Sequence, residues 1–192
     1  MIPVTFILSV GNLSFAEMQE YTMKVAIFFG SKSDTEVMKK AAAVLTEFGV
    51  EYEAFVLSAH RAHDLLEKTV RRMEESGAEV IIAGAGLAAH LPGVIAAMTV
   101  LPVIGVPLEC RSMDCKGRSS SGLAGLDALF SIVQMPPQIP VASVGVNNAG
   151  NAGYLAVEML AIKYPELRSK LTEFRARLAK EAEENGGLGV TL

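Results

Sequence analysis

The sequence predicts an α/β protein in which a parallel β-sheet is covered by helices on both faces. From Lys24 onward, short apolar runs alternate with segments of helical periodicity, the pattern of repeated strand–helix units. The runs KVAIFFG, AEVIIAGAG and LPVIGVPL are continuously apolar, as strands buried on both faces are. Because 51% of the residues are hydrophobic and only 20% are charged, the composition fits such a sheet, or a subunit that hides surface in an oligomer.

The predicted elements follow one another closely. Residues 24–30 form the first strand, and a helix over 33–48 ends at Gly49, because glycine tolerates the left-handed backbone of a helix C-cap. Further strands are expected over 50–59, 78–86, 101–108 and 139–146. Further helices are expected over 64–76, 125–134 and from Asn148 to about Glu184.

Three parts are expected along the chain. Residues 1–22 form an N-terminal extension that is a candidate for disorder, 23–165 the α/β domain, and 166–192 a C-terminal helix and tail. Met23 directly precedes the first strong strand and is the expected natural start. The last helix carries an apolar stripe that we expect to pack on a neighbouring subunit rather than on its own domain. The stripe is Leu167, Leu171, Phe174 and Leu178.

Composition excludes several classes of protein. A net charge of −4 and a pI near 5.4 argue against nucleic acid or an anionic membrane as partner, but not against a small phosphorylated ligand. The first segment holds no Lys or Arg, so a signal peptide is not expected, and no apolar run approaches the roughly 20 residues of a spanning helix. Cys110 and Cys115 lack a histidine nearby, so we expect reduced thiols and no metal site.

The motif GSKSD, Gly30 to Asp34, lies between the first strand and the first helix. A helix N-terminus offers free N–H groups and a positive dipole end to an anion, and Ser31 and Ser33 add hydroxyl donors. Asp34 is an acceptor suited to ribose hydroxyls. Two interpretations stay open: a phosphate or ribose site, or a structural cap in which Ser33 pairs with Glu36.

The motif SAHR, Ser58 to Arg61, lies at the predicted carboxyl end of the second strand. His60 can carry a proton and Arg61 can hold an anion, at the end of the sheet where parallel strands place their ligands. The alternative is a polar loop with both side chains in solvent. We favour function for this pair and interpret His63 as a surface residue near a helix start.

The segment AGAGLAAHLPG follows the third strand. Its small residues fit the dinucleotide pattern G-x-G-x-x-[GA], with Glu109 at the end of the next strand. That pattern belongs to the first strand–helix unit of a chain, and His90 crowds the helix start that should receive a pyrophosphate. The alternative is a backbone that approaches a small ligand closely, or, for His90 alone, a buried and hydrogen-bonded histidine. The residues that fit the pattern are Gly84, Gly86 and Ala89.

The segment GLDALFSIVQMP places Asp127 and Ser131 one helical turn apart. Because a polar pair on an apolar helix is usually part of the packing, we interpret these residues as structural.

Six segments in this order resemble the PurE family, the catalytic subunit of phosphoribosylaminoimidazole carboxylase. They are GSKSD, SAHR, AGAG-x-AAHLPG, LPVIGVP, SIVQMP and N-A-x-x-L-A (Asn151 to Ala156), and they cover most of the chain from about Lys24. The resemblance implies a three-layer α/β sandwich with a flavodoxin- or Rossmann-like parallel sheet and a C-terminal helical arm. It also implies a homo-octamer whose active sites are shared between subunits.

The resemblance further implies a reaction of purine (IMP) biosynthesis, the isomerisation of N5-carboxyaminoimidazole ribonucleotide to 4-carboxyaminoimidazole ribonucleotide. Such a carboxymutase is cytoplasmic, needs no metal or cofactor, and is coupled to an ATP-dependent carboxyaminoimidazole ribonucleotide synthase. His60 matches the general acid/base, which protonates nitrogen during decarboxylation and removes the proton of carbon 4 after recarboxylation. The substrate-binding positions implied are Ser31, Ser33, Asp34, Ser58, Arg61, Gly86, Ala88, Ala89, His90 and Leu91.

Several positions depart from the family pattern. Leu87 stands where a second consecutive glycine is usual, Pro137–Gln138 occupies a place that usually contains glycine, and Ala62–His63 replaces Thr-Pro. Residues 110–121 resemble an insertion in a loop that is short in relatives.

Three alternatives stay open at this point. A related class carboxylates aminoimidazole ribonucleotide directly with carbon dioxide, but it usually has Lys after the motif histidine and lacks AAHLPG, so Arg61 and His90 favour the mutase. A catalytically silent nucleotide-binding relative would be supported only by Leu87 and the inserted loop. A dinucleotide oxidoreductase would rest on the glycine pattern alone.

Overall fold

The computed structural model describes residues 23–109, 111–113, 119–121 and 123–186. The predicted extension 1–22, the last residues 187–192 and both cysteines lie outside this part of the chain.

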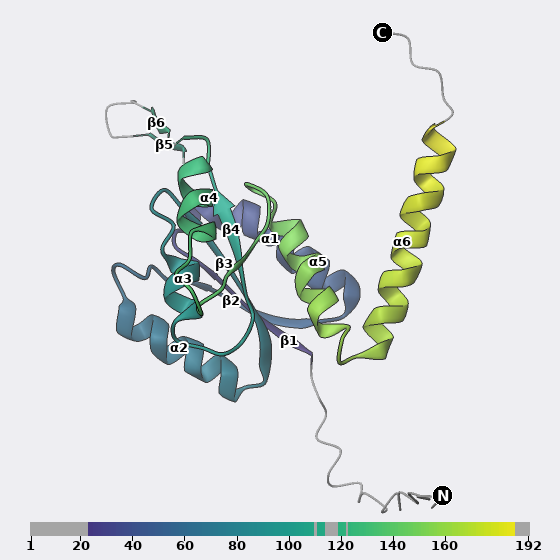
Figure 1. Cartoon of the computed structure of the whole chain (residues 1–192), viewed down its shortest axis with the longest axis horizontal. Helices are drawn as coiled ribbons and strands as arrows, with labels where there is room; N and C mark the ends of the chain where they lie inside the picture. Colours follow the sequence, from purple (N-terminus) through teal and green to yellow (C-terminus); the bar gives the residue numbers. More distant parts are fainter. Residues whose placement is uncertain (1–22, 110, 114–118, 122, 187–192) are drawn as a thin grey trace, which may run out of the picture.

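Five parallel strands form the central sheet in the order β2-β1-β3-β4-β7, with helices on both sides (Figure 1). This is the order of flavodoxin-like folds, and it confirms the predicted fold class. A second sheet of two antiparallel strands lies in the segment predicted to be an insertion. The strands are β1 (Lys24–Phe29), β2 (Glu51–Val56), β3 (Ala78–Gly86), β4 (Val103–Leu108), β5 (Arg111–Met113), β6 (Ser119–Ser121) and β7 (Ala142–Ser143).

The helices form the two outer layers. Helices α1 and α5 cover one face of the sheet, and α2, α3 and α4 cover the other (Figure 1). The helices are α1 (Thr35–Phe48), α2 (His63–Glu75), α3 (Leu91–Ala96), α4 (Leu126–Val133), α5 (Ala149–Leu160) and α6 (Pro165–Gly186), with a short 3-10 turn at Lys32–Asp34.

Strand β1 is buried on both faces, as its continuous apolar sequence predicts. Val25, Ile27 and Phe29 point into the core beneath α1 and α5, whereas Ala26 and Phe28 point into the core beneath α2, α3 and α4. The alternation follows from the two-residue period of a strand. One sheet thus separates two hydrophobic cores.

Small residues let α5 approach α1 closely. A Cβ added at Gly153 would lie 2.9 Å from the Cβ of Val44 and 3.0 Å from the carbonyl oxygen of Ala41. Ala152 and Ala156, on the same helix, are fully buried. The motif N-A-x-x-L-A therefore has a packing role, because larger side chains would separate the two helices.

The long predicted helix is in fact two helices. It breaks after Leu160, and Pro165 begins α6, a position that suits proline because its missing N–H would have no helical partner. The connection is anchored by Tyr164, whose hydroxyl donates to Glu79 Oε1 at 2.5 Å. The last strand is also shorter than predicted, since only Ala142–Ser143 pair with β4.

The first half of α6 packs on its own domain, so the expectation that the whole stripe serves a neighbour is wrong. Leu167 is fully buried, and the ring of Phe174 stacks on Tyr154 with centroids 5.0 Å apart. Lys170 Nζ donates to the carbonyl of Phe48 at 2.8 Å, at the C-terminal end of α1. The second half of α6 extends away from the domain, and Leu178 is 46% exposed (Figure 1).

Over the described ranges, none of the helices has the length and apolar character required to cross a bilayer.

The close approach of α5 to α1 generates a stability prediction. Gly153→Ala should destabilise the fold by about 1–3 kcal/mol, because the added methyl meets backbone and a β-branched side chain that cannot move aside. Gly150→Ala is the matched control in the same helix. Its Cβ would meet nothing closer than 4.0 Å, so the protein should be unchanged or up to about 1 kcal/mol more stable. Urea unfolding measures both, and equal values for the two variants would contradict the packing argument.

Candidate active site

A cavity of about 230 Å³ lies at the carboxyl ends of β1, β2 and β3. Phe29 pairs with Val56 of β2 and with Gly84 of β3, so the loops that follow the three strands begin at the same level. The predicted site residues come together here, with the exceptions of Ser33 and Ala89. Those lining the cavity are Ser31, Asp34, Ser58, His60, Arg61, Gly86, Ala88, His90 and Leu91.

The GSKSD loop is held by its own hydroxyls. Ser31 is the N-cap of the 3-10 turn and accepts a hydrogen bond from the N–H of Ser33 at 3.3 Å. The two hydroxyl oxygens lie 2.8 Å apart, and Ser33 Oγ donates to Asp34 Oδ1 at 3.1 Å. The predicted capping box is wrong, since Asp34 precedes α1 and Glu36 instead pairs with Lys39. Ser33 orients the residues on either side of it.

The carboxyl group of Asp34 is partly removed from water. Burial raises the pKa of Asp34, and the hydrogen bonds from Ser33 and from the Ser31 backbone act in the opposite direction. A carboxylate that has lost part of its hydration and has no cationic partner is stabilised when hydroxyl groups of a ligand donate hydrogen bonds to it. This property fits the predicted ribose-binding role.

Arg61 reaches from the loop after β2 toward the loop after β1. Its Nη2 donates to the carbonyl of Gly30 at 3.3 Å, and its N–H closes a turn with the carbonyl of Ser58 at 3.2 Å. Arg61 also lines an adjoining shallow hollow of about 400 Å³, which includes Lys32. Arg61 therefore borders both spaces, where its guanidinium could hold the anionic end of a ligand.

Two histidines that line the cavity meet each other. His60 Nε2 and His90 Nδ1 lie 2.9 Å apart, and the rings are almost perpendicular, at 89°. Such a bond needs one donor and one acceptor, so a protonated His60 requires His90 to present a bare Nδ1. The sequence indicated each histidine separately but not their pairing, since the residues are 30 positions apart.

The loop after β3 forms an apolar wall beside the histidines. Gly86, Leu87, Ala88 and Leu91 line this side, and Leu87 has a positive φ of 55°. A leucine thus adopts the left-handed backbone conformation that glycine adopts most freely. The N–H of His90 donates to the carbonyl of Ala88 at 2.7 Å, which holds the histidine at the start of α3.

The glycine pattern of this loop does not form a dinucleotide site. Gly84 lies inside β3, where a Cβ would come 2.5 Å from Met38 Sδ and 3.2 Å from Leu108 Cδ1. It is a packing glycine. Ala89, the third residue of the pattern, is buried in the core, and α3 has only six residues.

The remaining candidates lie outside the cavity. Ser131 Oγ donates to the carbonyl of Asp127 at 2.8 Å within α4, which confirms a structural role for this hydroxyl. His63 is exposed at the first position of α2. Throughout the described residues, no group of three or more His, Cys, Asp or Glu is placed to hold a metal ion.

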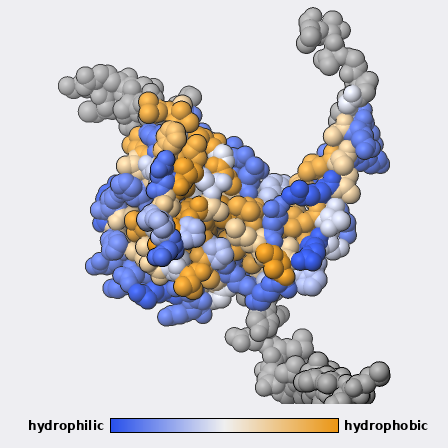
Figure 2. All heavy atoms as spheres, viewed as in Figure 1, coloured by the Kyte–Doolittle hydropathy of each residue, from blue (hydrophilic) through white to orange (hydrophobic). Residues whose placement is uncertain are grey.

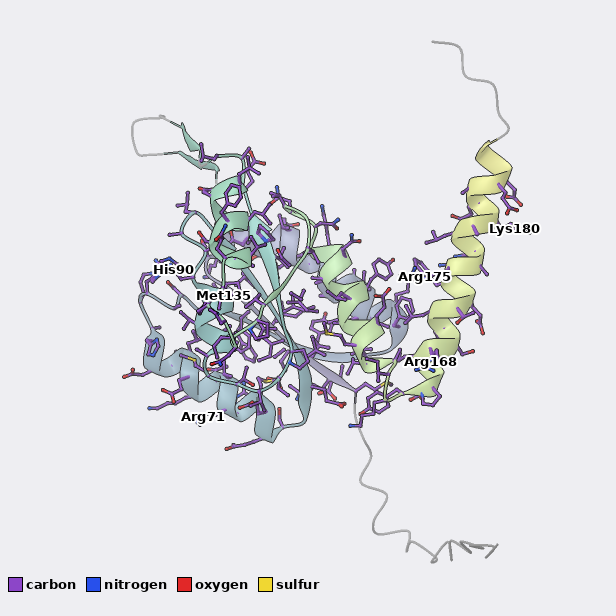
Figure 3. All side chains as sticks on the ribbon, in the orientation of Figure 1. Arg71, His90, Met135, Arg168, Arg175 and Lys180 are labelled. Atoms are coloured by element: carbon purple, nitrogen blue, oxygen red, sulfur yellow. The ribbon has the colours of Figure 1, made fainter. Side chains whose placement is uncertain are left out.

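A larger hollow of about 620 Å³ lies between α5 and α6. Its floor is apolar, with Tyr154, Leu155, Leu171 and Phe174, and an ion pair between Arg175 and Glu158 crosses it. Figure 3 shows His90 on the opposite side of the domain from Arg168, Arg175 and Lys180 of α6. The hollow and the histidine pair are therefore separate features.

Comparison with known proteins gives one consistent family. Residues 24–181 match the model of the family described as AIR carboxylase. The N5-carboxyaminoimidazole ribonucleotide mutase of Thermotoga maritima is 52% identical over 161 residues, which are 84% of this chain and 88% of that protein. The mutase of the same name from Pyrococcus abyssi is 55% identical over 79% of this chain and 82% of that protein.

A solved structure agrees. The crystal structure of Treponema denticola PurE superposes with a TM-score of 0.73 at 25% identity, covering 84% of this chain and 95% of that one.

The environment of Asp34 generates a prediction on its ionisation. We expect the Asp34 carboxyl to titrate at a higher pH than a free aspartate, because burial disfavours its charged form. Ser33→Ala should raise this pKa further, since it removes a donor to the charged form, whereas Ser58→Ala should leave it unchanged. Carbon-13 NMR of labelled aspartate carboxyls measures the three titrations. A pKa at or below the ordinary value would contradict the assigned cause.

Proposed function

The chain belongs to the AIR carboxylase family, and we propose that it is an N5-carboxyaminoimidazole ribonucleotide mutase, an isomerase of purine biosynthesis. The observation that carries this proposal is the hydrogen-bonded pair of His60 and His90 between a polar and an apolar wall of one cavity. The polar wall suits a ribose phosphate, and the apolar wall suits carbon dioxide, which carries no charge.

The polar wall binds the substrate. Asp34 accepts hydrogen bonds from the ribose hydroxyls, and Ser31 and Ser58 supply further hydroxyl groups. Arg61 holds the anionic phosphate end of the substrate. The aminoimidazole ring then extends toward His60. Binding through the distant sugar and phosphate keeps the ring in place while its carboxyl group leaves and returns.

The first chemical step breaks the carbamate bond. The bond between the amino nitrogen and the carboxyl carbon cleaves, its electron pair stays on nitrogen, and carbon dioxide is released. Protonated His60 gives its proton to that nitrogen, while the bare Nδ1 of His90 accepts the hydrogen bond of the His60 Nε2–H. The products of this step are aminoimidazole ribonucleotide and carbon dioxide.

The second step forms the new carbon–carbon bond. Carbon 4 of the electron-rich ring attacks carbon dioxide, and an electron pair of the carbon dioxide moves to oxygen to form the carboxylate. Neutral His60 then removes the proton of carbon 4, which restores the aromatic ring and returns the histidine to its starting state. A single positioned acid/base of this kind contributes about 10²–10⁴-fold in rate.

Direct carboxylation of free aminoimidazole ribonucleotide is not favoured. The chain has Arg61 and the complete AAHLPG segment, and the similar proteins of Thermotoga maritima and Pyrococcus abyssi are both named as mutases.

We further propose that the active form is a homo-oligomer, an octamer as the family resemblance implies. His60, His90 and Ala88 are exposed in the single chain, although trapped carbon dioxide requires a site closed to water. A second copy could complete the closure. Large apolar side chains are exposed over α4, at Leu126, Phe130 and Val133, where Figure 2 shows a hydrophobic surface.

The substrate and product are charged ribonucleotides, which do not cross membranes unaided, so we propose a cytoplasmic site of action. The N-carboxylated substrate must come from a reaction that activates bicarbonate. An ATP-dependent carboxyaminoimidazole ribonucleotide synthase is the expected functional partner.

The proposed reaction predicts the fate of a carboxyl label. With N5-carboxyaminoimidazole ribonucleotide labelled with carbon-13 in its carboxyl group, the wild type should move the label to carbon 4. His60→Asn should leave the label in place or lose it as carbon dioxide, because no group remains to transfer the proton. NMR follows both outcomes.

His63→Asn is the matched control, since His63 is an exposed histidine outside the cavity, and it should behave as wild type. Product formed only from aminoimidazole ribonucleotide and bicarbonate would establish direct carboxylation instead. Binding without any reaction would identify a silent relative.

The proposed assembly predicts a mass near eight times that of the 20.4 kDa chain by light scattering. Phe130→Glu should reduce this mass, because a charge replaces a ring that is 56% exposed on the apolar face of α4. Leu65→Glu, at a 54% exposed residue of α2, is the matched control. A monomeric wild type would contradict both the octamer and the sharing of sites between subunits.

A further inference from the structure

Leu87 combines backbone strain with exposure. Its φ of 55° lies in the left-handed region, where the Cβ of an ordinary residue is crowded by its own backbone. The side chain is 46% exposed, so packing against the rest of the chain does not explain its presence. A glycine would adopt this conformation freely. Strained residues that persist in this way gather at functional sites.

Leu87 lies at the rim of the cavity that holds the histidine pair. It follows Gly86, the last residue of β3, and precedes Ala88, whose carbonyl accepts the N–H of His90. The left-handed turn thus fixes the position of His90 and the leucine side chain together. Both residues line the same cavity as His60.

The cavity is open where the chemistry needs closure. Carbon dioxide is small, uncharged and free between the two steps of the mutase reaction, so it can diffuse away before carbon 4 attacks. Because carbon dioxide carries no net charge, a charged group cannot hold it strongly. It can then be retained only by apolar contacts and by a side chain that obstructs the exit from the cavity. Ala88 next to Leu87 offers only a methyl group, and Gly86 offers no side chain.

We propose that the side chain of Leu87 retains carbon dioxide beside His60 and His90, so that recapture by carbon 4 exceeds loss to solvent. This inference rests on the proposed mutase function. The leucine side chain at the strained position covers the exit, which a glycine at this position would leave open.

A second strained position supplies an internal control. Gln138 also has a positive φ, of 78°, and it is not among the residues that line the cavity. Replacing it by glycine relieves the same kind of strain without altering the rim. Effects of relieved strain and of a lost side chain can therefore be separated.

The test measures how the enzyme divides labelled substrate between two products. Wild type, Leu87→Ala, Leu87→Gly and Gln138→Gly are incubated with carboxyl-labelled N5-carboxyaminoimidazole ribonucleotide and an excess of unlabelled bicarbonate. The ratio of aminoimidazole ribonucleotide released to labelled 4-carboxylated product is determined by NMR, after subtraction of the spontaneous decarboxylation seen without enzyme. Melting temperature and mass in solution are recorded for each variant.

Both Leu87 variants should raise this ratio about fivefold, which corresponds to about 1 kcal/mol between the two competing barriers. Leu87→Gly and Gln138→Gly should each raise the melting temperature by about 2 °C, and Gln138→Gly should leave the ratio unchanged. Leu87→Ala separates the side chain from the backbone, because alanine keeps the strain and removes the cover.

Three results would overturn the proposal. An unchanged ratio in Leu87→Ala and Leu87→Gly removes any retaining role, and a change in Leu87→Gly alone assigns the effect to backbone freedom. A change of ratio that accompanies a lower mass in solution makes Leu87 a subunit contact. Failure of the wild type to form 4-carboxylated product is a different outcome, which refutes the mutase function itself and this inference with it.

Discussion

The position of β1 between β2 and β3 is the constraint on which the rest of the molecule depends. Every residue of β1 is buried, and its neighbours on both sides run parallel to it. Because the chain leaves β1 toward one side and returns on the other, the loops diverge and leave a crevice at the carboxyl ends. The three segments that carry the candidate site residues follow these three strands, so burial of the sheet alone brings them to the same end of the sheet.

The division of the cavity into two unlike walls follows from which loop supplies each wall. Loops after β1 and β2 carry hydroxyls, the Asp34 carboxylate and Arg61, whereas the loop after β3 carries Gly86, Leu87 and Ala88. A ribonucleotide needs the first kind of surface and carbon dioxide needs the second. The two histidines come from opposite walls, and their hydrogen bond lies between the polar and the apolar side of the cavity.

Residues other than glycine also adopt the left-handed backbone that glycine tolerates best. Leu87 and Gln138 both have a positive φ. Surrounding contacts impose the turn at Leu87, since the bond between His90 and Ala88 and the end of β3 fix the chain on both sides.

Sequence alone determined the alternation of strands and helices, the placing of GSKSD, SAHR and AGAGLAAHLPG at strand ends, and the family, because periodicity and ordered motifs are local properties. Only the tertiary structure decided what each motif residue touches. In the structure His60 pairs with His90, and Gly84 is a packing residue. Asp34, not Ser33, is the N-cap residue of α1, and Leu167 and Phe174 pack on their own domain. These outcomes depend on strand order and on helix approach, which join residues distant along the chain, and no local pattern records such contacts.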